Sequence, residues 1–544
     1  MFVLAADETA AELPGGLQGL DYAAIVAYLL LTFGIAVWFS RKQTSTEDFF
    51  VGGRRIPFIA VGLSILATLF STISYLGNPG EIVKRGIGMF LGQASLPLSF
   101  LVIAFVWVPF FMRLRLTSAY EYLERRFSPP VRFMAGGLFM FLRLGWMSVV
   151  VFAASTALMQ IKGGDWAWLP GDDMLWCVGM IGIVAAVYTA MGGMEALVWV
   201  DVLQCLLLLA GVLLAIGYVV YIDGTGPADW WSTAANYRQT HTSLEWFSFD
   251  VTVRFTVVTA IVNTFFWTIC THGSDQVVLQ RYFATGSVQA ARKSYFINMG
   301  VDITMATLMS LAGLALLAYY LNHSGQLPAG QTADKMADKL FPHFLGTRLP
   351  AGCAGLIVSA FLCDAIQTLE SGANAIAAVI SQDLLPNRKQ ATAEAKEANL
   401  KFARAMTFAV TLLVTLFAYV VNYIVTAREL TIVDIMPKFF NLFLGPLAGM
   451  FFVGMFLPRS STRAVVPAAL AGLLVSILWA WWDVLIDKDV TPSIAYSTVV
   501  PYSVTVVTAA VLGYLLPRSE EDASKAQRYG WWNVVYGKDA GVAE

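Results

Sequence analysis

The sequence has 544 residues, of which 57% are hydrophobic and only 13% are charged, with a formal net charge of -2 at pH 7. Soluble domains carry about a quarter of charged residues, so this composition predicts a polytopic membrane protein. The charges sit in the connections between apolar segments and form no basic patch, which excludes a nucleic-acid-binding protein. The five cysteines lack metal-ligand spacing and are expected to be buried free thiols.

Apolar windows of some 20 residues, the length that crosses a bilayer, occur about thirteen times along the chain. They are expected to begin near Leu20, Pro57, Gly88, Val131, Trp166, Ala196, Val251, Ser294, Ala351, Lys401, Val433, Val465 and Thr498. Basic residues, Arg54, Arg125 and Arg281 among them, gather in alternate connections. By the positive-inside rule this predicts an external tail (1–19), a transmembrane domain (20–517) and a polar cytoplasmic tail (518–544).

Two of the predicted spans are interrupted by glycine, proline or polar residues. The second span loses its apolar character over residues 71–80, and the seventh loses it over residues 268–275. Such interruptions are typical of the broken helices of secondary transporters. Because the two interruptions lie five spans apart, the sequence predicts an all-α membrane protein with a five-plus-five inverted repeat. Spans 2 to 6 would form one bundle and spans 7 to 11 the other, with the binding site between them.

The ninth predicted span, over residues 356–380, carries polar residues on one face, since successive residues turn by about 100°. They are Asp364, Gln367, Thr368, Ser371 and Asn374, with Glu370 at the edge of the stripe. An acidic side chain at the centre of a membrane helix costs about 2.5 to 3.5 kcal/mol on insertion scales, so it persists mainly where it faces a cavity, a partner or an ion. The stripe predicts either that the protein transports a polar solute or ion, or that these polar groups pack against other helices inside the protein.

Five segments resemble the sodium:solute symporter family, and together they cover the chain from about Asp21 to Leu516. In chain order they are DFFVGGRRIPFIAVGLS, TSAYEYLERRF, YTAMGGMEALVWVDVLQ, SDQVVLQRYFATGSVQAARKS and QTLESGANAIAAVISQDLL. This is also their order in the family. The resemblance implies the five-plus-five transporter fold and solute uptake driven by an ion gradient through alternating access. It does not identify the solute.

The resemblance also implies a sodium site where the broken second span meets the ninth span. In the family, two backbone carbonyls from one helix bind the ion together with one carbonyl and two adjacent hydroxyls from the other. Matched residue by residue, the carbonyls belong to Ala67, Phe70 and Asp364, and the side-chain pair is Gln367 and Thr368.

The family pattern is altered at two of these positions. The Gln367 amide oxygen can still bind a hard cation, although its side chain is longer than that of a hydroxyl residue. Asp364 places a carboxylate where the family usually has a small residue, so it strengthens sodium binding, carries a proton instead, or marks a site without ion coupling.

Some members have a second sodium site with an aspartate in a WxD motif. Asp201 occupies that position, with Thr368 as the hydroxyl, and can equally be a structural hydrogen-bond hub.

Family members line the solute cavity with the unwound second span, the start of the third, the middle of the fourth and the seventh. The corresponding residues are Leu69, Ser74, Tyr75, Gln93, Arg143, Trp146, Thr271 and His272. Gln93 falls where sugar transporters of the family contact hydroxyls, or alternatively joins two helices by a hydrogen bond. Tyr75 adjoins the unwound segment and is the candidate gate.

An arginine inside a membrane helix is rare, and its planar fork suits a carboxylate. Arg143 lies one turn before Trp146, where sialic-acid transporters of the family carry an arginine, so the sequence favours a carboxylate-bearing solute. Alternatively, Arg143 pairs with an acid such as Asp302 or Glu370. His272 is either a titrating gate or a hydrogen-bonded structural residue. Asp302 is expected near a helix end.

These features predict a secondary active symporter that takes up a small polar organic solute, with sodium or alternatively a proton at Asp364 as the coupling ion and no cofactor. A membrane enzyme is disfavoured because the four histidines lack ligand spacing, whereas a transporter-like solute sensor stays as an alternative. We expect a functional monomer in a bacterial cytoplasmic membrane, with the solute and lipid as partners and no nucleic acid.

Overall fold

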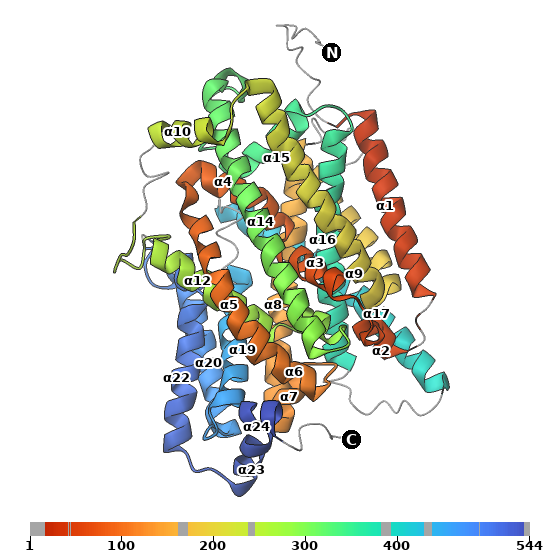
Figure 1. The fold of residues 1–544 in the computed structure, drawn as a ribbon, viewed down its shortest axis with the longest axis vertical. Coiled ribbons are helices and arrows are strands. Elements are labelled where there is room, and N and C mark those ends of the chain that lie inside the picture. The colour runs from red at the N-terminus through yellow and green to blue at the C-terminus, as the bar shows by residue number, and fades with distance from the viewer. Residues whose placement is uncertain are drawn as a thin grey trace.

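The computed structural model describes residues 17–41, 43, 45–161, 172–237, 245–381, 393–428, 438–488 and 490–537, and every regular element within them is helical. Most helices run roughly along the long axis, with α10 (Pro227–Tyr237) at one end and α23 (Glu520–Tyr529) and α24 (Trp531–Tyr536) at the other (Figure 1). The expected span starts near Trp166 and Val433 lie outside the described residues.

The remaining helices follow one another with short connections. In the first half they are α1 (Gly19–Ser40), α2 (Thr46–Val51), η1 (Gly52–Arg54), α3 (Phe58–Leu69), α4 (Thr72–Arg85), η2 (Ile87–Ser95), α5 (Leu96–Val102), η3 (Ile103–Trp107), α6 (Val108–Leu114), α7 (Tyr120–Arg126), α8 (Pro129–Ile161) and α9 (Asp173–Asp223). In the second half they are α12 (Val257–Ser274), α13 (Gln276–Phe283), α14 (Val288–Asn322), η4 (Ser324–Gln326), α15 (Ala337–Arg348), α16 (Cys353–Val379), α17 (Ala393–Arg428), α19 (Asn441–Phe456), α20 (Thr462–Ala480), α21 (Trp482–Leu485), η6 (Ile494–Tyr496) and α22 (Val499–Leu515).

Within the described residues, nine helical segments are long and apolar enough to cross a membrane. The other predicted spans fall on segments that are broken or short: α3 with α4, the first part of α9, α12 with α13, and α19. Helix α9 contains two of the predicted spans, separated at Gly193, whose φ of 69° interrupts the helix. The helical membrane architecture is confirmed, whereas the count of about thirteen spans and the inverted repeat stay predictions.

Both predicted helix breaks are present. The first lies at Phe70 and Ser71, between α3 and α4, where Phe70 has φ -90° and ψ 78°. The second is Asp275, between α12 and α13, which has extended backbone angles. Residues 77–80 are not the break, because α4 continues through them with Pro79 inside the helix. The first unwound point therefore lies at the start of the polar segment that the sequence indicated.

Helix α16 lies at the centre of the molecule and packs against α9, α1, α8 and α17. All of its polar stripe is buried, so the stripe faces protein and not lipid. Its N-terminus is capped by another helix, since Asp21 Oδ1 of α1 accepts hydrogen bonds from the amides of Gly352 (2.8 Å) and Gly355 (2.7 Å). Gly355 allows this close approach, because a Cβ there would lie 2.4 Å from the Asp21 backbone.

The segment after residue 517, predicted to be a polar tail, contains two helices that pack on the body of the protein. Helix α23 contacts α7, and α24 contacts α6. Trp531 is buried, and its indole Nε1 donates to the carbonyl oxygen of Val106 at 2.9 Å. Val106 belongs to η3, a π-helical turn, and such turns interrupt the regular α-helical pairing. The aromatic residues of α24 explain why this segment packs although the tail is polar overall.

Gly355→Ala is expected to destabilise the protein by about 1 to 3 kcal/mol, because the new methyl group forces α1 and α16 apart. Thermal unfolding in detergent measures the effect. Gly300→Ala is the matched control, since a Cβ at Gly300 meets nothing within 4 Å and alanine favours helix. Equal unfolding temperatures for the two variants would refute the close α1–α16 contact.

Candidate ion and solute sites

The residues predicted to bind the ion meet where α3 ends against α16. Ala67 lies in the last turn of α3 and Phe70 directly after it, where backbone carbonyls have no following helical amides. Across the junction, Gln367 Nε2 donates to Thr68 Oγ1 at 3.3 Å. The remaining oxygens, Gln367 Oε1 and Thr368 Oγ1, are buried without a hydrogen-bond partner among the described residues. Oxygen ligands of this kind suit a hard monovalent cation.

The Asp364 side chain caps the N-terminus of α4. Its Oδ2 accepts hydrogen bonds from the backbone amide and the hydroxyl of Thr72, the first residue of α4. Its Oδ1 accepts a third from Gln204 Nε2 of α9 at 2.8 Å. Both carboxylate oxygens therefore face donors, and the helix N-terminus adds favourable electrostatics. Asp364 joins three helices through its side chain and leaves its backbone carbonyl as the predicted ion ligand.

Asp201 pairs with a buried arginine. Arg281 Nη2 donates to Asp201 Oδ2 at 3.0 Å and to Ser371 Oγ at 2.9 Å, and Arg281 Nε donates to Ser64 Oγ at 2.8 Å. The Arg281 residue is 1% exposed, so counting it among the basic residues of an inner connection was wrong. The Arg281 guanidinium can be buried because the Asp201 carboxylate balances its charge. Asp201 is thus a hydrogen-bond hub, although its Oδ1 has no partner among the described residues.

Arg143 also forms a buried ion pair. Its Nε donates to Asp275 Oδ1 at 3.1 Å, and its Nη2 donates to Asp275 Oδ2. Asp275 in turn caps α13, since its Oδ1 accepts the backbone amide of Val277 at 2.9 Å. The partner is therefore neither Asp302 nor Glu370. Glu370 is fully buried, and both of its carboxylate oxygens lack a hydrogen-bond partner in the described residues.

A cavity beside the α3–α4 break brings together most of the predicted solute-binding residues. Those that line it are Leu69, Ser74, Gln93, Trp146 and His272. His272 Nδ1 shares a hydrogen bond with the Tyr282 hydroxyl at 2.6 Å, so this ring is both a cavity wall and a structural partner.

The other predicted solute-binding residues, Tyr75, Arg143 and Thr271, are buried and do not line the cavity. The Tyr75 hydroxyl donates to the Leu208 carbonyl at 3.3 Å, and its ring packs on Phe341. Sequence reasoning missed several polar residues that line the cavity: Asn78, Asn263, Asn298, Asp302 and Asn441. The costly placement of polar groups in the eighth span was the signal that could have identified Asn298 and Asp302.

Comparison with known proteins identifies the family. The Sodium:solute symporter family matches residues 49–475, most of the chain. The chain belongs to the sodium:solute symporter family. This symporter is 30% identical to the Sodium/sialic acid symporter NanT of Aliivibrio fischeri, over 85% of this chain and 87% of NanT. It is 31% identical to the human Sodium/iodide cotransporter, over 84% of this chain and 69% of that protein.

A solved structure of a sodium-coupled sialic acid symporter in a substrate-bound outward-open state has the same fold. The TM-score is 0.78 at 24% identity, covering 92% of this chain and 98% of that one. The family consists of transporters and not enzymes, so this symporter is an integral membrane protein that couples the movement of a small solute to sodium.

Asp364→Asn is expected to raise the sodium concentration for half-maximal uptake about tenfold, because hydrogen bonds to a charged acceptor are stronger than those to a neutral one by roughly 1 kcal/mol or more. The dependence of uptake on a pH gradient should stay unchanged. Glu397→Gln, at an exposed carboxylate on α17, is the control. If the variant lost only pH-driven accumulation and kept its sodium affinity, Asp364 would be a proton carrier.

Proposed function

We propose that this symporter takes up a small polar organic solute together with sodium, and that the ion binds where α3 meets α16. The observation that carries this proposal is the pair of buried oxygens without partners, Gln367 Oε1 and Thr368 Oγ1, beside the open end of α3. Sodium would bind them together with the carbonyls of Ala67, Phe70 and Asp364. Because this site joins a broken helix to α16, its occupancy would bias the movement of one against the other.

We propose that a second sodium ion binds at Asp201 and Thr368. Asp201 Oδ2 is held by Arg281, whereas Asp201 Oδ1 and Thr368 Oγ1 have no partner among the described residues. Proton coupling at Asp364 is the alternative. Two donors, the Thr72 amide and Gln204 Nε2, favour the charged carboxylate and hence sodium. The Thr72 hydroxyl favours neither ion, because it also donates to the Phe361 carbonyl at 3.0 Å and can then accept a proton from Asp364.

For the solute, the sequence favours a carboxylate, and relatives named sialic acid symporters support that preference. The cavity beside Leu69, Ser74, Gln93, Trp146 and His272 would hold it. Tyr75, Arg143 and Thr271, which are buried outside the cavity lining, would affect the solute indirectly. In the conformation described, the Arg143 guanidinium already has Asp275 as its partner. Arg143 would reach a solute carboxylate only by leaving that pair.

Reconstitution into proteoliposomes tests the coupling, with labelled sialic acid and a neutral sugar as solutes. An inward sodium gradient should drive accumulation, and uptake that ignores both sodium and pH gradients would refute a coupled mechanism.

Arg143→Gln should reduce uptake of acidic and neutral solutes alike, because it leaves Asp275 charged, buried and unpaired, at a cost of about 3 to 5 kcal/mol. The double variant with Asp275→Asn should recover part of the loss. A loss confined to acids would instead make Arg143 the carboxylate anchor.

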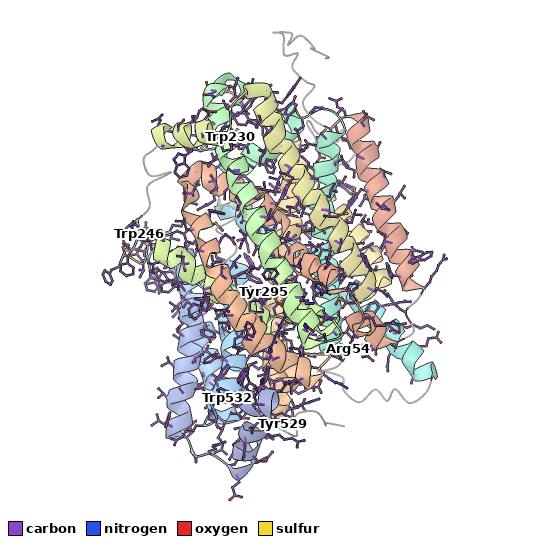
Figure 2. The ribbon with its side chains drawn as sticks, in the orientation of Figure 1. Arg54, Trp230, Trp246, Tyr295, Tyr529 and Trp532 are labelled. Atoms are coloured by element: carbon purple, nitrogen blue, oxygen red, sulfur yellow. The ribbon has the colours of Figure 1, made fainter. Side chains whose placement is uncertain are left out.

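We also propose that the symporter is a monomer in a bacterial cytoplasmic membrane, with the N-terminus outside and the C-terminus inside. Arg54, from a basic connection, lies in the same half of the molecule as Tyr529 of α23, and Trp230 of α10 lies at the opposite end (Figure 2). Positive-inside charge supports this orientation. The division into an external tail, a transmembrane domain and a cytoplasmic segment stays a prediction.

Labelling with a membrane-impermeant maleimide checks the orientation. A cysteine introduced by Ser232→Cys on α10 should react in intact cells, whereas one introduced by Ser524→Cys on α23 should react only after lysis. Both positions are exposed. The reverse pattern would invert the topology.

A further inference from the structure

The solute cavity contains a carboxylate to which the described residues give no hydrogen bond and no ion pair. Asp302 lines the cavity from α14, a helix of 35 residues. It lies near the middle of this helix and not at its end as the sequence suggested, because α14 begins earlier, at Val288. Tyr295, two turns before Asp302, lies near mid-height on the molecule (Figure 2). Keeping an unpaired carboxylate at this depth costs free energy, so Asp302 is a candidate for binding a ligand.

The surroundings of Asp302 are rich in acceptors. Asn298, one helical turn earlier, is only 4% exposed, and its Oδ1 has no partner among the described residues. Gln93 Oε1 and Asn441 Oδ1 also line the cavity without a partner. An amide can turn to present its NH₂ group, whereas a carboxylate can only accept. Among the described residues, the cavity therefore offers several acceptors and one unpartnered donor, Trp146 Nε1, and Asp302 is the acceptor in it that suits a positively charged donor.

Among the described residues that line the cavity, His272 is the one side chain able to carry a positive charge, and its Nδ1 is engaged with the Tyr282 hydroxyl. No lysine or arginine is among the described residues that line it. Two arginines on other helices or connections, Arg143 and Arg254, already have partners, since Arg143 pairs with Asp275 and Arg254 Nε donates to Glu81 Oε1 at 2.9 Å. An ionised Asp302 would then take its counter-charge from the ligand.

Two observations favour an organic cation over a second metal ion at Asp302. The indole rings of Trp146 and Trp267 line the same cavity, and such rings attract organic cations through their π faces. The oxygens proposed for sodium belong to the end of α3, to α9 and to α16, and none belongs to α14. We infer that the transported solute carries a protonated amine, whose ammonium group binds the Asp302 carboxylate beside Asn298. This inference rests on the proposed function, and it is compatible with a carboxylate elsewhere on the solute.

The test compares four ligands of one carbon frame: glucosaminic acid, glucosamine, gluconate and glucose. Binding to the purified full chain is measured by thermal shift in saturating sodium. Each amine-bearing ligand should bind at least tenfold more tightly than its counterpart without the amine. In Asp302→Asn this preference should fall below threefold. Equal binding with and without the amine, or a preference that survives in Asp302→Asn, would overturn the inference.

Further variants separate charge recognition from folding. Asp302→Glu should keep the amine preference, and Asp250→Asn, at an exposed carboxylate outside the cavity, should leave it unchanged. A tenfold rise in the sodium requirement of Asp302→Asn would assign this carboxylate to the ion and refute the ammonium site. Because thermal shift reports binding and not accumulation, amine selectivity can hold even if the sodium-driven uptake of the proposed function fails.

Discussion

The need to pair backbone amides inside a membrane determines the arrangement of this symporter. In hydrocarbon, an amide without an acceptor costs several kcal/mol, and a helix that begins within the membrane exposes up to four such amides. At the two helix breaks and at the start of α16, an aspartate meets the helix N-terminus. Asp275 is the N-cap of α13 itself, whereas Asp364 and Asp21 come from other helices. Asp21 caps α16, Asp364 caps α4, and Asp275 caps α13. Without these carboxylates the two broken helices could not be kept open.

Each cap creates a negative charge that needs its own partner. Arg143 balances Asp275, and Gln204 donates to Asp364. This explains why an arginine is found within a membrane helix without invoking a solute. The side chains left without partners then stand out. Gln367 and Thr368 face the open end of α3, and Asp302 faces the cavity. The buried polar groups that have partners are thus structural, and those without partners are the ones proposed to bind ion or solute.

Periodicity and composition predicted most of the architecture, because they depend on local sequence. The helical membrane fold, the two breaks and the burial of the α16 stripe all followed from residues close together in the chain. The partners did not, since Arg143 and Asp275 are separated by 132 residues, and nothing local indicates which acid an arginine meets. Arg281 was placed in a connection and Asp302 near a helix end because helix boundaries are the least reliable part of such predictions. The roles of the individual site residues likewise depend on distant contacts.

The contact of Trp531 with the Val106 carbonyl has a consequence for biosynthesis. The two residues are 425 positions apart, so the π-helical turn is completed by a helix that is translated long after it. Chains are made at about 5 to 20 residues per second, which leaves this carbonyl without its indole for roughly 20 to 85 seconds. During that interval the early helices must rely on water, lipid headgroups or insertion factors. This contact therefore forms only after α24 has been translated.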